Sequence, residues 1–445
     1  MNKVDITTLI YDWQNLILKR RGVARYNESD ILSSIPSKPI KIITGFRRAG
    51  KSFLAQRIAK QLVENGKYKI ENILYLNFED YQLSDVNSAK KLGDVYAVFL
   101  SDIAKTGPKL IFLDEIQNVS GWDKFVRTIY EKEDDIEIIL TGSNSELLSA
   151  ELGSNLAGRF IEFFLFPFDF KEFLSYKNIF IRDENDYLRN KAELEKLFAE
   201  YLNYGGLPEI FEISSEDAKF SYLKGIITKV VLDDIVKRFN VDNVDVLERL
   251  LNYVLSNVGG AVSYTNLKNK IKQLGLEVKV ETVIKYVSYF AKTFVVFELN
   301  KFDWKQRKVF SSSKKYFATD VGLTSLFRPS RENLSMKLEN LIFLHLKKKN
   351  GNIFYGANER GREVDFILRR DDIYYDKYQV CSGLDKDNLA RELGVFNLSD
   401  KYLKGGDNFI LTSKADIEPE VLKKYHVNHY NIIRWLLEKP QGRLK

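Results

Sequence analysis

The chain has 445 residues, of which 44% are hydrophobic and 29% charged, and its formal net charge is +7. This length predicts about three units, each large enough to bury its own core. No apolar run reaches the roughly 18 residues that a membrane span requires, and the N-terminus lacks the pattern of a secretion signal. A single cysteine, Cys381, excludes an intramolecular disulfide framework, and with only three histidines it cannot complete a usual structural zinc site. We therefore expect a cytoplasmic protein with no membrane role.

Four short apolar runs in the first 145 residues, separated by longer helical or polar stretches, indicate buried parallel strands. They lie at residues 40–44, 72–78, 109–113 and 136–141. Strands that alternate with helices predict an α/β fold, a parallel sheet flanked by helices. Ligands bind such sheets at the carboxyl ends of the strands.

The remaining chain predicts three further segments. Residues 146–240 are helical and rich in aromatic residues, which indicates a helical lid on the sheet. Residues 241–330 give the order helix, turn, short helix, helix and strand that is typical of a winged-helix domain. Residues 331–445 return to mixed α/β with strands near 363–368, 373–381 and 408–412. The predicted core thus occupies residues 1–145, and the other three segments follow it.

A glycine-rich loop joins the first strand to the following helix. Residues 45–52 match the pattern G-x-x-x-x-G-K-[ST] in the strand–loop–helix context that a P-loop needs. Backbone N–H groups of such a loop cradle the β-phosphate of a nucleotide. Lys51 is expected to contact the β- and γ-phosphates, and the Ser52 hydroxyl to ligate Mg²⁺. The predicted nucleotide-binding residues are Gly45, Arg48, Ala49, Gly50, Lys51, Ser52 and Phe53.

Two acids follow the apolar strand 109–113 at the same predicted edge of the sheet. Asp114 is expected to hold Mg²⁺, and Glu115 to orient and partly deprotonate the water that attacks the γ-phosphate. Small polar residues follow the next strand, where Ser143 and Asn144 compete for the role of sensing the γ-phosphate or positioning the water. We predict Asn144 for that role, although a plain polar turn is the commoner explanation.

At this point the sequence resembles AAA-type P-loop ATPases of archaea and bacteria that carry a winged helix and a C-terminal nuclease-like domain. The resembling stretches are Gly45–Ser52, Leu113–Gln117, Leu140–Ser149, Ala157–Arg159, Gly205–Pro208, Lys315–Leu323 and Glu363–Phe366. The resemblance implies a preference for ATP over GTP. It also implies that Arg159 could reach the γ-phosphate of a neighbouring subunit, which would require a homo-oligomer; a local pair with a carboxylate is an equal alternative.

A DNA partner is suggested by charge. Residues 301–350 hold twelve Lys or Arg against four Asp or Glu, and such a basic stretch attracts nucleic-acid phosphates or simply forms a solvated face. The helix expected from Val280 carries Lys279, Lys285 and Lys292 at or near its ends and on its surface. We expect phosphate contacts with weak sequence preference.

The last segment resembles the PD-(D/E)xK nucleases, with Glu339 on a helix and Asp365 on a strand. The position of the expected lysine is Cys381, in the run Gln379-Val380-Cys381. Lys377 shares a strand face with Gln379 and Cys381 and could reach the site instead. We expect a degenerate, catalytically silent domain.

The sequence therefore predicts Mg²⁺-dependent ATP binding and hydrolysis, coupled to a conformational change on DNA or a protein partner. The predicted catalytic residues are Glu115, Lys51, Asn144 and Arg159. A nucleotide-binding switch with negligible turnover, or a metal-dependent nuclease, remains the alternative.

Overall fold

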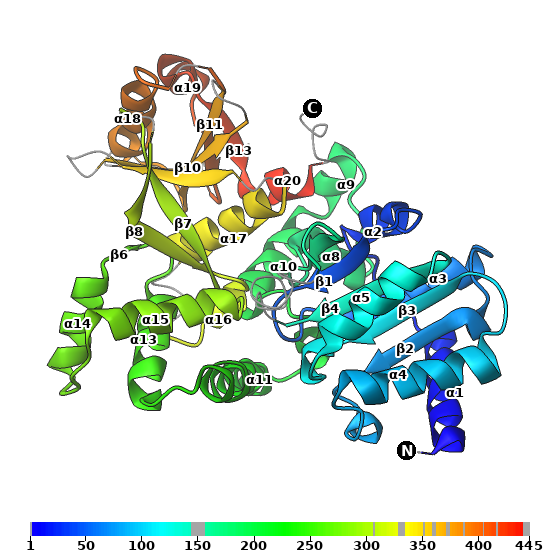
Figure 1. Ribbon diagram of the computed structural model, residues 1–445. Helices are drawn as coiled ribbons and strands as arrows, with labels where there is room; N and C mark the ends of the chain where they lie inside the picture. The colour runs from blue at the N-terminus through cyan, green and yellow to red at the C-terminus, as the bar shows by residue number, and fades with distance from the viewer. Residues whose placement is uncertain are drawn as a thin grey trace. The chain divides into compact units, whose positions relative to one another are not determined.

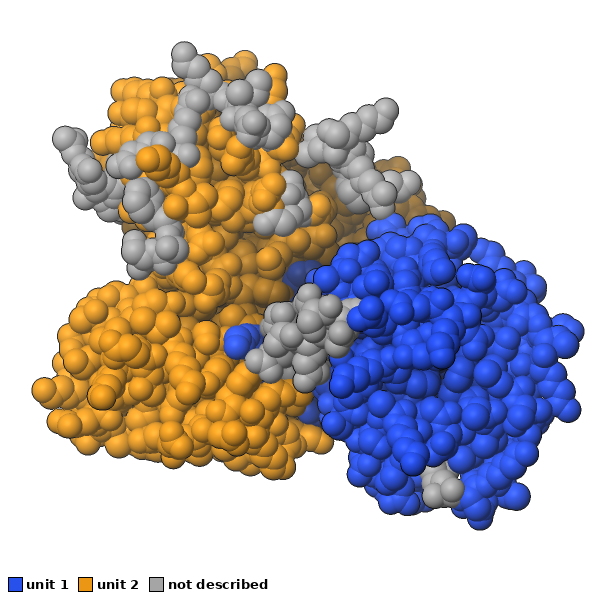
Figure 2. Space-filling model, viewed as in Figure 1, with its two compact units in different colours: residues 1–167, 292–294 blue, residues 168–291, 295–445 orange. Residues whose placement is uncertain are grey.

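The computed structural model describes residues 2–143, 156–305, 308–327, 334–349, 352–357, 362–370, 374–385, 388–403, 405–414 and 417–438. The chain forms two compact units, residues 1–167 with 292–294 and residues 168–291 with 295–445 (Figure 1, Figure 2). No helix in these described ranges is both long enough and apolar enough to cross a membrane.

The first unit alternates helices with strands. Its elements are α1 (Lys3–Lys19), α2 (Glu28–Ser34), β1 (Ile40–Thr44), α3 (Lys51–Glu64), η1 (Ile70–Asn72), β2 (Ile73–Asn77), η2 (Tyr81–Leu83), α4 (Ala89–Val98), the π-helical η3 (Phe99–Ile103), β3 (Lys109–Asp114), η4 (Ile116–Asn118), α5 (Trp122–Lys132), β4 (Ile136–Gly142) and β5 (Phe160–Phe164). The strands form one parallel sheet in the order β2-β3-β4-β1-β5 (Figure 1). This confirms the predicted α/β class with its parallel sheet.

Both faces of this sheet are buried, because alternate residues of each strand enter different cores. On one face, Leu74, Leu76, Ile111 and Leu113 pack with residues of α1, α4 and α5. On the other face, the neighbouring residues of the same strands pack with α2 and α3. Strands buried on two sides read as continuous apolar runs, which is why the sequence revealed them.

Helix α1 covers the edge strand β2. The Gln14 side-chain amide donates to the Ile73 carbonyl at 2.9 Å, and Trp13 lies 4.9 Å from the Tyr75 ring, between centroids. An uncovered edge strand offers free backbone groups to other chains, so this helix protects the sheet.

The second unit begins with helices and ends with strands. Its elements are α8 (Phe170–Tyr176), α9 (Glu184–Arg189), α10 (Lys191–Tyr204), η5 (Pro208–Glu212), α11 (Glu216–Lys229), the π-helical η6 (Val230–Val236), α12 (Lys237–Phe239), α13 (Val244–Ser256), β6 (Ala261–Val262), α14 (Tyr264–Gln273), α15 (Val280–Lys292), β7 (Val296–Asp303), β8 (Lys308–Ala318), α16 (Val321–Thr324), α17 (Leu334–Lys349), β9 (Ile353–Ala357), β10 (Glu363–Arg369), β11 (Tyr375–Cys381), α18 (Leu389–Ser399), β12 (Asn408–Thr412), α19 (Pro419–Tyr425), β13 (Asn428–Asn431) and α20 (Ile432–Leu437).

An eight-stranded sheet in the order β13-β12-β11-β10-β9-β7-β8-β6 runs through this unit. From α13 to β8 the elements follow the order helix, strand, helix, helix, strand, strand, with β6 and β7 both antiparallel to β8. The parallel pair β7–β9 continues the sheet across residue 330, where the sequence predicted a domain boundary. The division into four segments stays a prediction.

A buried carboxylate joins two glycine-containing turns in this unit. Asp320 accepts the Gly206 N–H at 2.7 Å and the Gly322 N–H at 2.8 Å. Gly205 has a φ of 79°, and a Cβ there would lie 1.7 Å from an Asp320 carboxylate oxygen. Both turns belong to stretches that resembled family motifs in the sequence. In the structure, the Asp320 carboxylate holds them together.

Candidate functional site

The glycine-rich loop lies between β1 and α3, and its backbone explains its glycines. Gly45 has a φ of 154°, and a Cβ on it would lie 2.3 Å from the Leu165 carbonyl oxygen. Gly50 has a φ of 96° and directly precedes Lys51, the first residue of α3. Arg48 also takes a left-handed conformation, at φ 65°. The loop therefore turns tightly and directs the amino-terminal end of α3 toward the sheet edge.

The segment before β1 braces this loop. Arg25, which is 6% exposed, donates to the carbonyl of Ala49 at 2.9 Å and to that of Phe166 at 2.6 Å. The guanidinium of Arg20 lies 5.1 Å from the centre of the Phe53 ring. Two residues of the predicted nucleotide-binding set are thus held by arginines that the sequence did not single out.

The two predicted metal ligands meet at the end of β3. The Ser52 side chain lies near enough to the Asp114 carboxylate, which is 1% exposed, to lower its pKa. Thr141 also donates to this carboxylate, and the Tyr75 hydroxyl donates to its Oδ2 at 2.6 Å. Burial raises the pKa of Asp114, the nearby Glu115 charge raises it further, and the interactions with Thr141, Tyr75 and Ser52 oppose the shift.

Glu115 lies beside the loop lysine. One of its oxygens is 3.4 Å from the Lys51 ammonium, and the other accepts from the Gln117 amide at 2.5 Å. Although burial favours the neutral acid, the Lys51 charge and the Gln117 and Ser143 hydrogen bonds outweigh it, so the pKa of Glu115 lies below its ordinary value. Glu115 is therefore an ionised carboxylate, held in a left-handed conformation with a φ of 53°.

Tyr75, Gln117 and Thr141 are not among the site residues predicted from the sequence. Tyr75 is the one hydroxyl-bearing residue in the strand Ile-Leu-Tyr-Leu-Asn, and Gln117 stands two residues after Glu115. A polar group inside an otherwise aliphatic buried strand needs a partner, and that requirement was the available signal.

The remaining predicted residues of this site lie at different places. Ser143 contacts Glu115, whereas Asn144 falls outside the described residues. Arg159 immediately precedes β5, and its carbonyl accepts from the first residue of β1, Ile40, at 2.8 Å. Arg159 therefore lies at the amino-terminal ends of β1 and β5, whereas the glycine-rich loop follows the carboxyl end of β1. The Arg159 side chain lies 3.3 Å from the Glu131 carboxylate.

In the second unit, the nuclease-like residues surround a lysine from another strand. Lys315 on β8 forms an ion pair with Glu363, and the Glu339 and Asp365 charges also act on it. Burial, partly offset by Lys315, raises the pKa of Glu339 to about 7. Asp365 accepts the Val380 N–H at 2.8 Å. An ammonium group that the sequence pattern did not predict thus interacts with these acids.

β11 carries both Cys381, at the position of the expected lysine, and Lys377, the alternative lysine. Cys381 is buried, and burial raises its pKa to about 12. Lys377, which is 1% exposed, lies 2.8 Å from the Asp400 carboxylate and donates to Asn408 at 3.2 Å. Within the described residues, no group of three or more His, Cys, Asp or Glu side chains could hold a metal ion.

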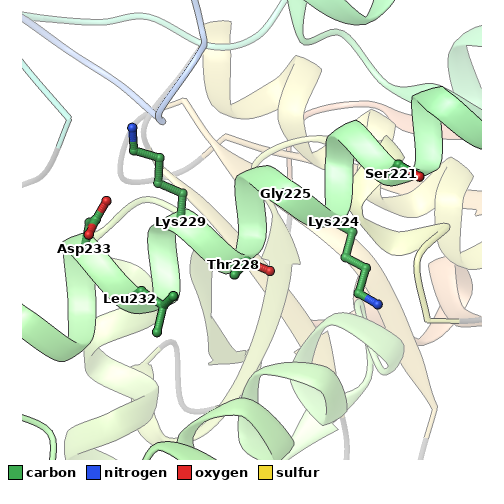
Figure 3. A pocket seen from close by; sticks show the side chains of 7 residues that line it. All are labelled: Ser221, Lys224, Gly225, Thr228, Lys229, Leu232 and Asp233. Atoms are coloured by element: carbon green, nitrogen blue, oxygen red, sulfur yellow. The ribbon is translucent and has the colours of Figure 1, made fainter.

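A shallow groove follows the surface of α11 and η6 (Figure 3). Its volume is about 510 Å³, and it is lined by Ser221, Lys224, Gly225, Thr228, Lys229, Leu232 and Asp233. All seven belong to one helical stretch, and none is a predicted site residue, so the groove adds no chemistry to the site.

Two family models match parts of the chain. Residues 37–174 match the model of an AAA domain, and residues 195–332 match a domain of unknown function. The chain is similar to the Walker-type ATPase PABY2304 of Pyrococcus abyssi, with 15% identity and a TM-score of 0.45 over 70% of this chain and 99% of that one.

Two curated proteins resemble nearly the whole chain. An uncharacterized protein of Haemophilus influenzae is 31% identical over 90% of this chain and 94% of its own length. Uncharacterized protein MJ1544 of Methanocaldococcus jannaschii is 32% identical over 88% of this chain and 86% of its own. The chain therefore belongs to the family of these two proteins, and its residues 37–174 match the model of an AAA domain.

Proposed function

We propose that this protein binds ATP with Mg²⁺ at the loop 45–52 and hydrolyses it. One observation carries the proposal: the loop and the end of β3 bring two pairs of functional groups into contact. The Ser52 side chain lies near enough to Asp114 to lower its pKa, and the Lys51 ammonium lies 3.4 Å from the Glu115 carboxylate. A lysine and a hydroxyl on one side and two acids on the other are the groups that phosphoryl transfer to water requires.

The residues fit a bound Mg²⁺. The Ser52 hydroxyl and the Asp114 carboxylate supply oxygen atoms, the ligands that this cation prefers. When bound, Mg²⁺ neutralises charge on the phosphate oxygens. The loop amides and Lys51 bind the phosphates, and the tight turn at Gly45 and Gly50 leaves room for the backbone to approach them.

Glu115 is the proposed general base. It is ionised and anchored by Gln117, so it can accept a proton from a water molecule that it also orients. Lys51 would exchange its contact with Glu115 for the phosphates when ATP binds, which releases one carboxylate oxygen for the water. Asn144 or Ser143 would position that water.

Two further proposals concern a neighbouring copy of this chain and a DNA or protein partner. Arg159 lies at the sheet edge opposite the loop, so within an assembly it would serve a neighbouring copy's phosphate and not its own. We further propose that hydrolysis is coupled to rearrangement of the winged-helix and nuclease-like segments on DNA or a protein, with the nuclease-like segment catalytically silent because Lys315 neutralises its acids.

Phosphate release by Glu115→Gln tests the enzymatic proposal. We expect hydrolysis to fall at least about a hundred-fold, in line with the usual contribution of a positioned base, while ATP affinity is kept. Glu71→Gln, an exposed acid in the same unit, is the matched control. Equal, near-zero rates for the wild type and Glu115→Gln, with ATP still bound, would leave a nucleotide-binding switch as the function.

A gel shift at two salt concentrations, with and without ATP, tests the DNA partner. Lys270 and Lys272 on α14, and Lys285 on α15, are exposed. Phosphate contacts from such lysines predict binding that weakens steeply with salt. Absence of any shift at low salt would favour a protein partner.

A further inference from the structure

A chain of hydrogen bonds connects the end of α1 to the predicted metal ligand. The Arg20 Nε donates to Gln56 Oε1 at 2.6 Å, and the Gln56 Nε2 donates to the Tyr75 hydroxyl oxygen at 3.1 Å. The Tyr75 hydroxyl in turn donates to Asp114 Oδ2 at 2.6 Å. Four elements of the first unit, the C-cap of α1, α3, β2 and β3, each contribute one residue.

All three bonds run in one direction. A guanidinium can only donate, so Gln56 Oε1 accepts from Arg20 and the Gln56 amide nitrogen is left to donate to Tyr75, whose own hydrogen then points to Asp114. Bonds aligned in this way polarise one another, and they are strongest where the ends are charged.

The Tyr75 hydroxyl does more than satisfy a buried position. A phenylalanine would fill the same volume, and the ring is already fixed by Trp13 at 4.9 Å and Phe112 at 5.9 Å. The hydroxyl is fully buried, and the one short bond it donates goes to the carboxylate that also contacts Ser52. With Thr141 on the other oxygen, Tyr75 therefore fixes the rotamer of Asp114.

We propose that Tyr75 is a positioning residue that orients Asp114 for Mg²⁺, and that Arg20 strengthens this hold through Gln56. The inference rests on the proposed ATP and Mg²⁺ site. It gives α1, which precedes the matched AAA domain, a direct connection to the metal ligand. A change in the position of Arg20 would then alter the site without touching the nucleotide.

Binding of a fluorescent ATP analogue, titrated with Mg²⁺ and repeated in EDTA, tests this role in the full-length protein. Tyr75→Phe should need about ten times more Mg²⁺ for half-maximal binding, which is the effect of one hydrogen bond to a charged group. Its affinity for the analogue in EDTA should equal that of the wild type. Arg20→Met should shift the Mg²⁺ requirement in the same direction by a smaller factor.

Tyr96→Phe is the matched control, because Tyr96 is a buried tyrosine of the same unit whose hydroxyl forms no hydrogen bond within the described residues. A Tyr75→Phe protein that titrates with Mg²⁺ as the wild type does would overturn the inference. Should Tyr75→Phe fail to fold, the Mg²⁺ titration of Arg20→Met tests the inference instead, since Arg20 is only half-buried. An unchanged Mg²⁺ requirement in Arg20→Met would then overturn the inference. A wild type that binds no analogue under either condition would instead refute the proposed function.

Discussion

Replacing Lys315 by methionine tests whether this residue neutralises the nuclease-like cluster. Methionine keeps most of the side chain's length and removes the ammonium group, with its charge and its hydrogen bond to Glu363. Lys315 is 3% exposed and pairs with Glu363, whose side chain is 31% exposed. Removing one partner of a buried ion pair costs about 3–5 kcal/mol, and we expect about 3 kcal/mol because Glu363 keeps access to water.

The loss should depend on pH. The pKa of Glu339 is already raised to about 7, mainly by burial, so the folded protein holds its proton at higher pH than the unfolded chain does. Stability linked to such a group is fully present below its ordinary pKa of 4.5 and is lost as the pH rises through 7. Without the ammonium this loss grows, so Lys315→Met should be strongly destabilised at pH 8 and much less at pH 5.

Hydrogen exchange of peptides from β10 and β11 measures the local opening free energy at both pH values. Lys337→Met is the control, because burial lowers the pKa of Lys337 to about 8 and, among the described residues, its ammonium bonds to the Asn203 amide and to no carboxylate. Its replacement should leave stability unchanged or raise it. Equal exchange in Lys315→Met and the wild type at pH 8 would refute the neutralising role, and so would stabilisation of the wild type by added Mg²⁺ at this cluster.

Three further changes probe the rest of the protein. Lys51→Ala should lower ATP affinity by roughly 10- to 100-fold, the range for a hydrogen bond from a charged group; unchanged affinity by calorimetry would contradict the phosphate site. Gly205→Ala should lower the melting temperature, because its Cβ would overlap Asp320 and its φ of 79° costs a side chain at least about 1 kcal/mol; Gly225→Ala, with open space around it, is the control. If Arg159 acts on a neighbouring subunit, mixing the inactive Arg159→Ala and Lys51→Ala proteins should restore part of the phosphate release, whereas no recovery would assign Arg159 to its local pair with a carboxylate.

The sequence predicted those features that depend on neighbouring residues. Strands buried on both faces appear as apolar runs, and β1 begins and ends at the predicted residues, 40 and 44. The glycine-rich loop and the acids 114 and 115 follow strands, so the parallel topology alone brings them to one edge. Side chains whose roles depend on distant partners could not be identified, because Lys315 and Glu363 are 48 positions apart.

Strand order explains one residue whose role the sequence did not reveal. β4 lies between β1 and β3, so the loop that follows β1 and the acids at the end of β3 are two strand spacings apart, or about 10 Å. Lys51 and Ser52 span this gap over the end of β4, where Thr141 donates to Asp114 and accepts the Glu115 N–H at 3.0 Å. A small hydroxyl at this position aligns both acids at once, whereas a valine of the same shape would leave the buried Glu115 N–H without its acceptor. At the end of β4, the Thr141 hydroxyl is therefore occupied by hydrogen bonds to the two acids and is not available to bind a phosphate.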